Sequence, residues 1–594
     1  MVAASFLTLN ARRVLEARYL RRDAERRICE TPEQLFERVA RGVAQAELLL
    51  GTARQAALWE AEFLGLLSSL DFLPNSPTLM NAGTPLGQLS ACFVLPVGDS
   101  MESIFEAVKQ MALVQRTGGG TGFSFSRLRP ARDPVASTGG EASGPVSFLR
   151  IFDCATEHIR QGGRRRGANM GVLRVDHPDI LEFIRAKTDG RALRNCNLSV
   201  AVTDQFMRAA ERGDPYVLIH PRTGESVGSA SAREVFDSIV KAAWETGDPG
   251  LLFSDAINRA NPTPRLGPIE ATNPCGEVPL LAYEACTLGS INLAHMVRAG
   301  DGHAYTDWER LRETAQKAVR FLDDVVEINR YPIPEIEQVS RGNRKIGLGV
   351  MGFAEMLIKL GIPYDSDEAV ATAGQVMACV AEAARRSSEE LARERGVFPR
   401  WPESAYANGG LRLRNATRTA IAPTGTIGIL AGTSPGIEPV FALAYRRTQV
   451  LGGQVLEEVN PLLRAQLRAR GLDEGRILSA VVARGTLEGV PGVPEELERL
   501  FVTALQIPAE RHLQVQAAFQ HHVDNAVSKT VNLPQDAPPA AIAEVYRRAW
   551  RLGLKGVTVY RYGSKASQVL ELGTADEAYH YDHLAKCDPT ECRL

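Results

Sequence analysis

Apolar residues recur at helical spacing through residues 12–70 of the chain. Leu15, Tyr19 and Leu20 follow this pattern, which places apolar side chains on one side of a helix. Thr31-Pro32-Glu33-Gln34 is typical of a helix start, with a hydroxyl that can cap the first turn and proline at the first helical position. The pattern predicts an N-terminal helical region over residues 1–70.

The pattern changes at Asp71, where short apolar runs begin to alternate with helical stretches such as residues 104–115, 309–329 and 539–554. Strands that alternate with helices favour an α/β fold with a buried sheet. We therefore expect an α/β domain over residues 71–570, followed by a polar, mobile tail over residues 571–594. The runs expected to form strands include Cys92–Pro96, Leu198–Val202, Tyr216–Ile219, Ala420–Pro423 and Val557–Tyr560.

Composition narrows the class of protein. The formal net charge of −2 gives no overall positive field that would attract nucleic acid or an anionic membrane. No apolar run is long enough to span a bilayer, and the first residues do not follow a signal-peptide pattern. The nine cysteines are scattered, which favours reduced thiols in the cytoplasm over a disulfide scaffold.

The segment Asn273-Pro274-Cys275-Gly276-Glu277 combines an amide, a thiol and a carboxylate at alternate positions. Proline and glycine between them favour a tight loop over a continuous helix. Such a loop could present a thiol beside a carboxylate for hydrogen or proton transfer. Taken alone, however, a Pro-Cys-Gly turn is more often structural than catalytic.

Six segments, taken together and in order, resemble the catalytic subunit of ribonucleotide reductases, and the resemblance covers residues 7–570. It implies a ten-stranded α/β barrel of two antiparallel five-stranded half-barrels with a central finger loop, preceded by N-terminal helices. The matching segments are Asn75–Gly83, Ser90–Cys92, Asn273–Glu277, Arg344–Gly352, Pro423–Thr426 and Val523–Asn532.

The resemblance also implies a role for each reactive side chain. Cys275 would become a thiyl radical and abstract hydrogen from the 3′-carbon of a ribonucleotide. Glu277 would act as general base toward the 3′-hydroxyl, and Asn273 would hold the sugar hydroxyls. Cys92 and Cys286 would deliver the reducing equivalents and finish as a disulfide.

The tail cysteines Cys587 and Cys592 would then reduce that disulfide by thiol exchange and be reduced in turn by thioredoxin or a similar dithiol donor. An alternative use is a zinc site built from His580, His583, Cys587 and Cys592, although no Cys-x-x-Cys pair anchors it. We therefore expect no metal site. The remaining cysteines match no catalytic position, and we interpret them as small packing residues: Cys29, Cys154, Cys196 and Cys379.

The segment Pro423–Gly428 places hydroxyls and bare backbone N–H groups together, which forms an anion site if a helix begins there. Alone this pattern is weak. The resemblance assigns it to the phosphates of the substrate. The expected substrate-binding residues are Ser76, Ser90, Ala91, Gly120, Thr424, Gly425, Thr426 and Ile427.

The resemblance further implies an allosteric deoxynucleotide effector bound at the interface of a homodimer. Asp99 and Arg129 match its binding positions. Lys187, Arg191 and Arg194 belong to the loop that would pass effector identity to the substrate base. The alternative to an effector role is that Arg191 and Arg194 simply lie in a solvated loop.

Two adjoining segments indicate which kind of radical generator the chain uses. Reductases with a separate radical subunit carry two adjacent tyrosines where this chain reads Thr558-Val559-Tyr560-Arg561, so that relay lacks one member. The segment Tyr562–Ser567 resembles cobalamin-dependent reductases, and we expect adenosylcobalamin as cofactor. Diphosphates are the expected substrates, with triphosphates left open. The rival hypotheses are the large subunit of a two-component reductase and a non-catalytic nucleotide-binding regulator.

Overall fold

The computed structural model describes residues 7–136, 139–161, 165–190, 192–300, 302–447 and 456–564. The chain begins with helices, as the periodicity predicts. Thr31 accepts a hydrogen bond from the Gln34 N–H while the Gln34 side chain accepts one from the Thr31 N–H, so the predicted helix start is a reciprocal cap. The N-terminal elements are α1 (Leu9–Val14), a π-helical turn (Leu15–Tyr19), α2 (Pro32–Leu50) and α3 (Ala53–Ser68).

Ten strands share one sheet. Five of them pair in parallel and form the first half: β2 (Cys92–Val94), β3 (Gly120–Ser124), β8 (Asn169–Arg174), β9 (Cys196–Val202) and β12 (Gly250–Phe253). The second half contains two parallel pairs: β15 (Ala285–Asn292) with β18 (Ile346–Met351), and β21 (Thr530–Leu533) with β22 (Gly556–Arg561). The halves meet in antiparallel fashion at β2–β15 and β12–β22, and β1 (Phe72–Pro74) adds to β15.

Backbone hydrogen bonds continue the second half from β18 to β21. The Ala420 N–H donates to the Leu348 carbonyl, and the Ile421 N–H donates to the Ala526 carbonyl. Residues 417–421 therefore lie between β18 and β21 in the position of a barrel strand. With them, the order of neighbouring strands closes on itself, as a barrel requires. The expected strand at residues 420–423 is reduced to these bridges because Pro423 has no N–H and Thr424 is left-handed, with φ of 47°.

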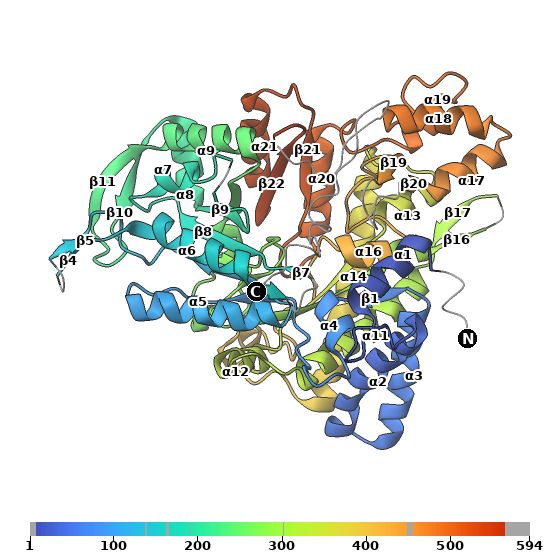
Figure 1. Ribbon diagram of the computed structural model, residues 1–594, viewed down its shortest axis with the longest axis horizontal. Helices are drawn as coiled ribbons and strands as arrows, with labels where there is room; N and C mark the ends of the chain where they lie inside the picture. Colours follow the sequence, from blue (N-terminus) through green and yellow to red (C-terminus); the bar gives the residue numbers. More distant parts are fainter. Residues whose placement is uncertain are drawn as a thin grey trace.

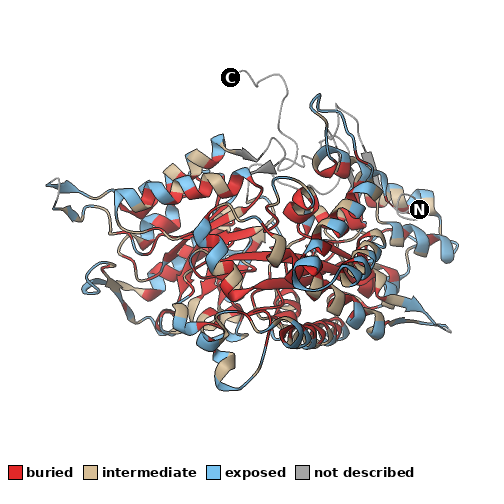
Figure 2. Cartoon of the chain, turned by 90° about the horizontal axis from the view of Figure 1, so that it is seen from below, coloured by how far each residue is buried: buried red, intermediate tan, exposed pale blue. Residues whose placement is uncertain are grey.

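Helices cover the outside of the strands, and buried residues gather at the centre of the molecule (Figures 1 and 2). One apolar cluster packs the N-terminal helices, α11 and α14 against β15 and β18, and a second packs α5, α6, α9 and α21 against the first half. The main helices are α4 (Ser76–Asn81), α5 (Met101–Arg116), α6 (Gly144–His158), α7 (Ile180–Arg185), α8 (Asp204–Arg212), α9 (Ala232–Thr246), α10 (Ser254–Arg259), α11 (Trp308–Ile328), α12 (Pro334–Asn343), α13 (Phe353–Leu360), α14 (Asp367–Arg395), α16 (Gly425–Ala431), α20 (Ala509–Gln520) and α21 (Pro539–Arg551).

Smaller units lie outside the barrel. The predicted strand at residues 216–219 forms as β10 (Pro215–Ile219), but it pairs only with β11 (Ser226–Ser231) in a hairpin whose Val217 is exposed. Helices α17 (Pro461–Ala469), α18 (Glu474–Arg484) and α19 (Glu495–Leu500) share a separate apolar cluster.

None of the helices in the described part of the chain is both long and apolar enough to span a membrane.

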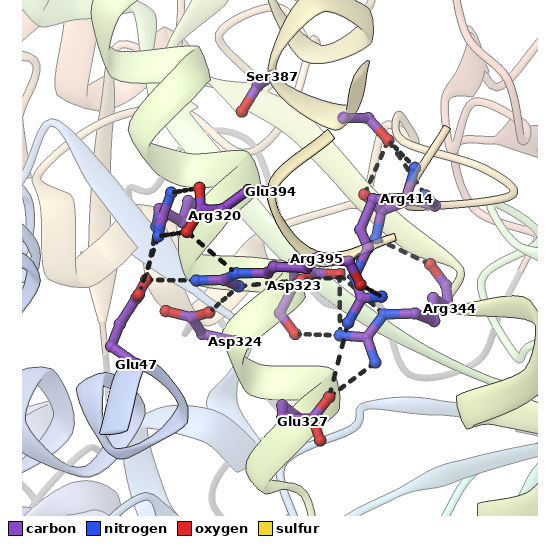
Figure 3. Close-up of polar contacts among 12 residues, drawn as sticks. Glu47, Arg320, Asp323, Asp324, Glu327, Arg344, Ser387, Glu394, Arg395 and Arg414 are labelled. Carbon is purple, nitrogen blue, oxygen red and sulfur yellow. Dashed lines mark hydrogen bonds and ion pairs between the residues drawn. The ribbon is translucent and has the colours of Figure 1, made fainter. Parts of the chain in front are cut away.

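A buried network of ion pairs joins the N-terminal helices to the barrel (Figure 3). Glu47 on α2 lies 2.7 Å from Arg395 of α14, and Arg395 also pairs with Asp324 of α11 at 2.7 Å. Asp323 on α11 lies 3.0 Å from Arg344. These contacts fix α2 and α14 to α11.

Candidate active site

A short hairpin carries the predicted catalytic segment. Strand β13 (Ala271–Thr272) pairs with β14 (Pro279–Leu280), and residues 273–278 connect them. The Val278 N–H donates to Asn273 Oδ1 at 3.0 Å, and Gly276 has φ of 82°, which glycine adopts without strain. The expected tight loop therefore forms, and its own asparagine closes it.

Close packing against the first half-barrel positions this loop. A Cβ on Gly122 of β3 would lie 1.8 Å from the Thr272 carbonyl oxygen, so only glycine lets the two backbones approach. A Cβ on Gly120 would lie 3.0 Å from Pro274 Cγ. Asn197 of β9 donates from Nδ2 to the Pro274 carbonyl at 2.8 Å. Pro274, the residue before Cys275, is therefore held by Gly120 on one side and Asn197 on the other.

Cys92 and Cys286 lie directly opposite each other on the antiparallel strands β2 and β15. Both are buried, with 4% and 0% of their surface exposed, and they belong to one interior apolar cluster. Asn273 Nδ2 donates to Cys92 Sγ at 3.1 Å. The structure therefore brings the finger loop and both predicted redox cysteines together.

Burial raises the pKa of the Cys92 thiol well above its ordinary value; the nearby acidic groups Glu277, Cys286 and Cys275 add to the rise, and the hydrogen bond from Asn273 opposes it. Burial also raises the pKa of Cys286, where Lys345 opposes the rise and Glu277 and Glu284 add to it. Both thiols are therefore protonated at neutral pH. A protonated thiol is the form that can donate a hydrogen atom.

Cys275 differs from this pair because it is exposed. It lies on the wall of a cavity of about 600 Å³, a volume typical of small-molecule sites. Polar residues on that wall include Arg194, Asn195, Asn197, Asp248, Ser528, Lys529, Thr530, Asn532, Thr558 and Tyr560. Sequence reasoning did not single out Asn197, because a polar residue within a strand has no partner until the strands are paired. Lys529 lies in the matching segment Val523–Asn532, but no role was predicted for it.

The predicted phosphate-binding residues lie apart from this cavity wall. Helix α16 begins at Gly425, which meets the condition stated for an anion site, and Thr424 Oγ1 accepts a hydrogen bond from the Gly436 N–H at 2.6 Å. The Ser76 hydroxyl lies 2.7 Å from the Tyr19 hydroxyl. Ser90 is buried two residues before Cys92 and accepts a hydrogen bond from Asn329 Nδ2 at 2.8 Å. Gly120, as described, contacts Pro274.

The predicted effector residues fall into two places. Arg129 pairs with Asp99 at 2.9 Å, so these two side chains bind each other. Lys187 pairs with Asp248 at 2.9 Å, and Asp248 and Arg194 both line the cavity beside Cys275. Arg191 lies outside the described residues.

The packing role predicted for the four other cysteines is confirmed for two of them and wrong for the other two. Cys196 is buried and Cys379 is half-buried, as packing residues should be. Cys29 and Cys154 are exposed, so the packing interpretation is wrong for them; each lies at a position that faces outward. Cys587, Cys592 and the alternative zinc ligands His580 and His583 lie outside the described residues. Within the described ranges, no group of three or more His, Cys, Asp or Glu side chains could hold a metal ion.

Sequence models of two domains match the chain. The model for "Ribonucleotide reductase, barrel domain" matches residues 90–413 and 412–560, and the model for "Ribonucleotide reductase, all-alpha domain" matches residues 5–87. The chain belongs to the ribonucleotide reductase family.

Individual relatives agree with this membership. The chain is 53% identical to a vitamin B12-dependent ribonucleoside-diphosphate reductase of Mycobacterium tuberculosis (strain CDC 1551 / Oshkosh), over 95% of this chain and 80% of that protein. It is 49% identical to a reductase of the same name from Thermoplasma acidophilum, over 96% of this chain and 81% of that one. The solved structure of the Actinobacillus ureae class Id ribonucleotide reductase alpha subunit has a TM-score of 0.75 at 23% identity and covers 95% of this chain and 98% of that chain, which shows the shared fold.

Proposed function

We propose that this protein is an adenosylcobalamin-dependent ribonucleoside-diphosphate reductase, which converts ribonucleotides to 2′-deoxyribonucleotides. The observation that carries the proposal is the arrangement of three thiols: a buried facing pair, Cys92 and Cys286, beside an accessible Cys275 on a finger loop. The family membership and the two vitamin B12-dependent relatives support the same reaction.

The resemblance implies a task for each residue, and the position of the three thiols supports it. Cys275, as a thiyl radical, takes the 3′-hydrogen of the ribose, while Glu277 accepts the 3′-hydroxyl proton and Asn273 holds the sugar. Cys92 and Cys286 then reduce the 2′-position and form a disulfide. Residues that face each other on antiparallel strands have Cα atoms about 4.5–5.5 Å apart, within the range a disulfide spans, so the bond needs little backbone movement.

The cavity beside Cys275 fits the nucleoside part of the cofactor. It has about 600 Å³, and amide and hydroxyl groups of Asn197, Ser528 and Tyr560 line it. These residues would hold the group next to the cysteine. Adenosylcobalamin, when bound, supplies the radical that oxidises Cys275. The burial of Cys92 and Cys286 keeps solvent away from the same reaction.

Further sites follow from the resemblance and are part of this proposal. The substrate's phosphates bind at the start of α16, through Thr424, Gly425, Thr426 and Ile427, together with Ser76, Ser90 and Ala91. The deoxynucleotide effector binds through Asp99 and Arg129 in a homodimer, and the loop with Lys187, Arg191 and Arg194 links it to the substrate base. Lys187 and Arg194 already lie at the Cys275 cavity or pair with a residue of its wall, which supports that link.

Reducing equivalents enter through Cys587 and Cys592 of the tail, which a thioredoxin-type dithiol reduces in turn. We assign the chain a helical region (residues 1–70), a barrel (71–570) and this tail (571–594). A cytoplasmic location suits the chemistry, because none of the seven cysteines within the described ranges forms a disulfide.

An assay of diphosphate reduction tests the proposal. The purified chain is incubated with a ribonucleoside diphosphate and dithiothreitol, with and without adenosylcobalamin, and no second protein. We expect deoxynucleotide only when the cofactor is present. Product that requires a second, metal-containing protein instead would assign the chain to the two-component class.

A further inference from the structure

A buried ion pair next to Cys286 takes no part in the reaction described above. Lys345 Nζ lies 2.6 Å from Glu284 Oε2, and each side chain is 1% exposed. Glu284 precedes Cys286 by two residues, and Lys345 directly precedes β18. Burying two charges carries a large desolvation penalty, so a buried pair is weak support for stability alone.

The strand register places Lys345 beside Cys286. Strands β15 and β18 are parallel, with Thr287 opposite Ile346, and one step back along both strands sets Cys286 opposite Lys345. Opposite residues on strands about 4.8 Å apart point to the same face of a sheet. A Cβ on Gly347 would lie 3.5 Å from Cys286 Sγ, and Gly347 shares a face with Lys345 because side chains alternate along a strand.

The hydrogen bonds of this pair leave the ammonium group able to act on its neighbour. Glu284 accepts from three donors: Lys345, Asn343 Nδ2 at 2.5 Å and the Leu281 N–H at 2.7 Å. Among the residues that the structure describes, Glu284 is the one hydrogen-bond partner of Lys345, whose ammonium has three N–H groups. The carboxylate is therefore held by other donors as well, while the lysine charge acts on Cys286.

The charges around the two thiols differ in sign. Burial disfavours a thiolate at both positions. At Cys286 the nearby charges are Lys345, which favours a thiolate, and Glu277 and Glu284, which disfavour it. At Cys92, Glu277 and the other two thiols disfavour a thiolate, and the group that favours one is the neutral amide of Asn273, which donates a hydrogen bond to Cys92 Sγ. A full positive charge therefore favours a thiolate at Cys286, whereas only a neutral hydrogen-bond donor does so at Cys92.

We propose that Lys345 sets the direction in which the Cys92–Cys286 disulfide is reopened, by stabilising Cys286 as the leaving thiolate. The inference rests on the proposed function, which supplies the disulfide. A thiolate of the reducing dithiol, either the tail pair Cys587 and Cys592 or an added dithiol such as dithiothreitol, attacks Cys92 Sγ and forms a new S–S bond there. The Cys92–Cys286 bond breaks, and its electron pair stays on Cys286 Sγ.

The proton and the second sulfur complete the step. The Lys345 ammonium protonates Cys286 and regains a proton from solvent, which received one when the attacking thiol ionised. The second thiol of the reductant then attacks its own sulfur in the mixed disulfide, releases Cys92 and gives it a proton. The reductant ends as a disulfide and both protein cysteines end as thiols.

Lys345 lines one small cavity, and a second cavity shares Asp524 with it. The first, of about 10 Å³, is lined by Lys345, Thr417 and Asp524 and has room for about one water molecule. Asp524 also lines a second cavity, of about 250 Å³, together with Arg385, whose side chain is 39% exposed. In this proposal, a water molecule in the first cavity returns a proton to Lys345.

Trapping of the mixed disulfide tests the proposal on the full chain. The enzyme is oxidised with diamide, treated briefly with 2-mercaptoethanol, alkylated and mapped by mass spectrometry. We expect mercaptoethanol on Cys92 and the alkylating group on Cys286. The double variant Lys345→Met/Glu284→Gln, which removes both charges and leaves neither stranded, should lose this preference. Its reduction by dithiothreitol should be about three- to tenfold slower, because a less stable thiolate leaves more slowly.

Two control variants show whether any change comes from the charge of Lys345. Lys345→Arg should restore both the site preference and the rate. Removing an ion pair between α11 and α3, by Lys317→Met/Glu62→Gln, should change neither. Mercaptoethanol on Cys286 in the wild type, or an unchanged preference and rate in the Lys345 double variant, would overturn the proposal. Because diamide forms the disulfide without nucleotide, failure of the proposed function appears separately, as the absence of ribonucleotide-dependent thiol loss.

Discussion

Three cysteines with the same side chain have different tasks because they differ in exposure to solvent. Cys275 is exposed at a cavity, whereas Cys92 and Cys286 are buried and face each other. Burial raises the pKa of both buried thiols and keeps them protonated at neutral pH, so they can donate hydrogen. The exposed thiol can meet a cofactor and a substrate. The same residue type therefore serves as radical carrier in one place and as reductant in another.

Substituting Cys275→Ser should abolish turnover, because a hydroxyl does not form the radical that the thiol forms. The thermal midpoint should stay within about 1 °C of wild type, since an exposed residue contributes little to the core. Deoxynucleotide formation and nucleotide binding are measured side by side. Activity in this variant would contradict the mechanism, and loss of nucleotide binding would point to a structural role for the loop.

At the scale of elements, the finger hairpin is positioned by a strand that lacks side chains where the two meet. Gly122 of β3 lies against the Thr272 carbonyl, and Asn197 of β9 binds the Pro274 carbonyl. The reactive loop is therefore placed by the first half-barrel, while Cys286 belongs to the second half. Catalysis requires both halves to keep their relative position.

Gly122→Ala should displace the finger loop, because its Cβ would lie 1.8 Å from the Thr272 oxygen. We expect at least tenfold lower activity together with lower stability. Gly374→Ala is the matched control: this glycine lies in α14 with open space around it, and the change should add up to about 1 kcal/mol of stability. Chemical unfolding and turnover are measured for both variants. Full activity in Gly122→Ala would show that the hairpin shifts without consequence.

At the scale of the whole molecule, charged side chains inside the protein connect its parts. The network in Figure 3 joins α2, α11 and α14, so the N-terminal helices and the barrel share one buried set of ion pairs. Burial alone would raise the pKa of Asp323, but Arg344, Arg414 and Arg395 outweigh it and lower the pKa to about 2. Burial raises the pKa of its neighbour Asp324 well above the usual range.

Asp323→Asn should lower the free energy of unfolding by about 3 to 5 kcal/mol, because it strands buried arginines. Asp324→Asn should cost less, since burial raises the pKa of Asp324 and so disfavours its charged form. The pKa of Asp323 is lower in the folded state, so its stabilisation is present above about pH 4 and is lost as the pH falls toward 2. Urea unfolding measured between pH 7 and pH 3 should show the wild type and Asp323→Asn converging. A constant difference would contradict the assignment.

The sequence by itself determined the elements and the chemistry. Helical periodicity and the cap at Thr31 predict the N-terminal helices, and alternating strands and helices predict the α/β class. The order of family segments identifies the barrel and its cysteines. These features are local, or are carried by short motifs, so they are readable along the chain.

Only the tertiary structure decided what is close to what. The resemblance named Cys92 and Cys286 as partners, but it did not show how they meet. Their position directly opposite each other, the support that Asn197 gives to the loop, and the position of Lys345 beside Cys286 depend on strand register. Register joins residues far apart in the sequence, and Cys92 and Cys286 are 194 positions apart, so no local pattern specifies it. The exposure of Cys29 and Cys154 was likewise settled only when the surrounding elements packed.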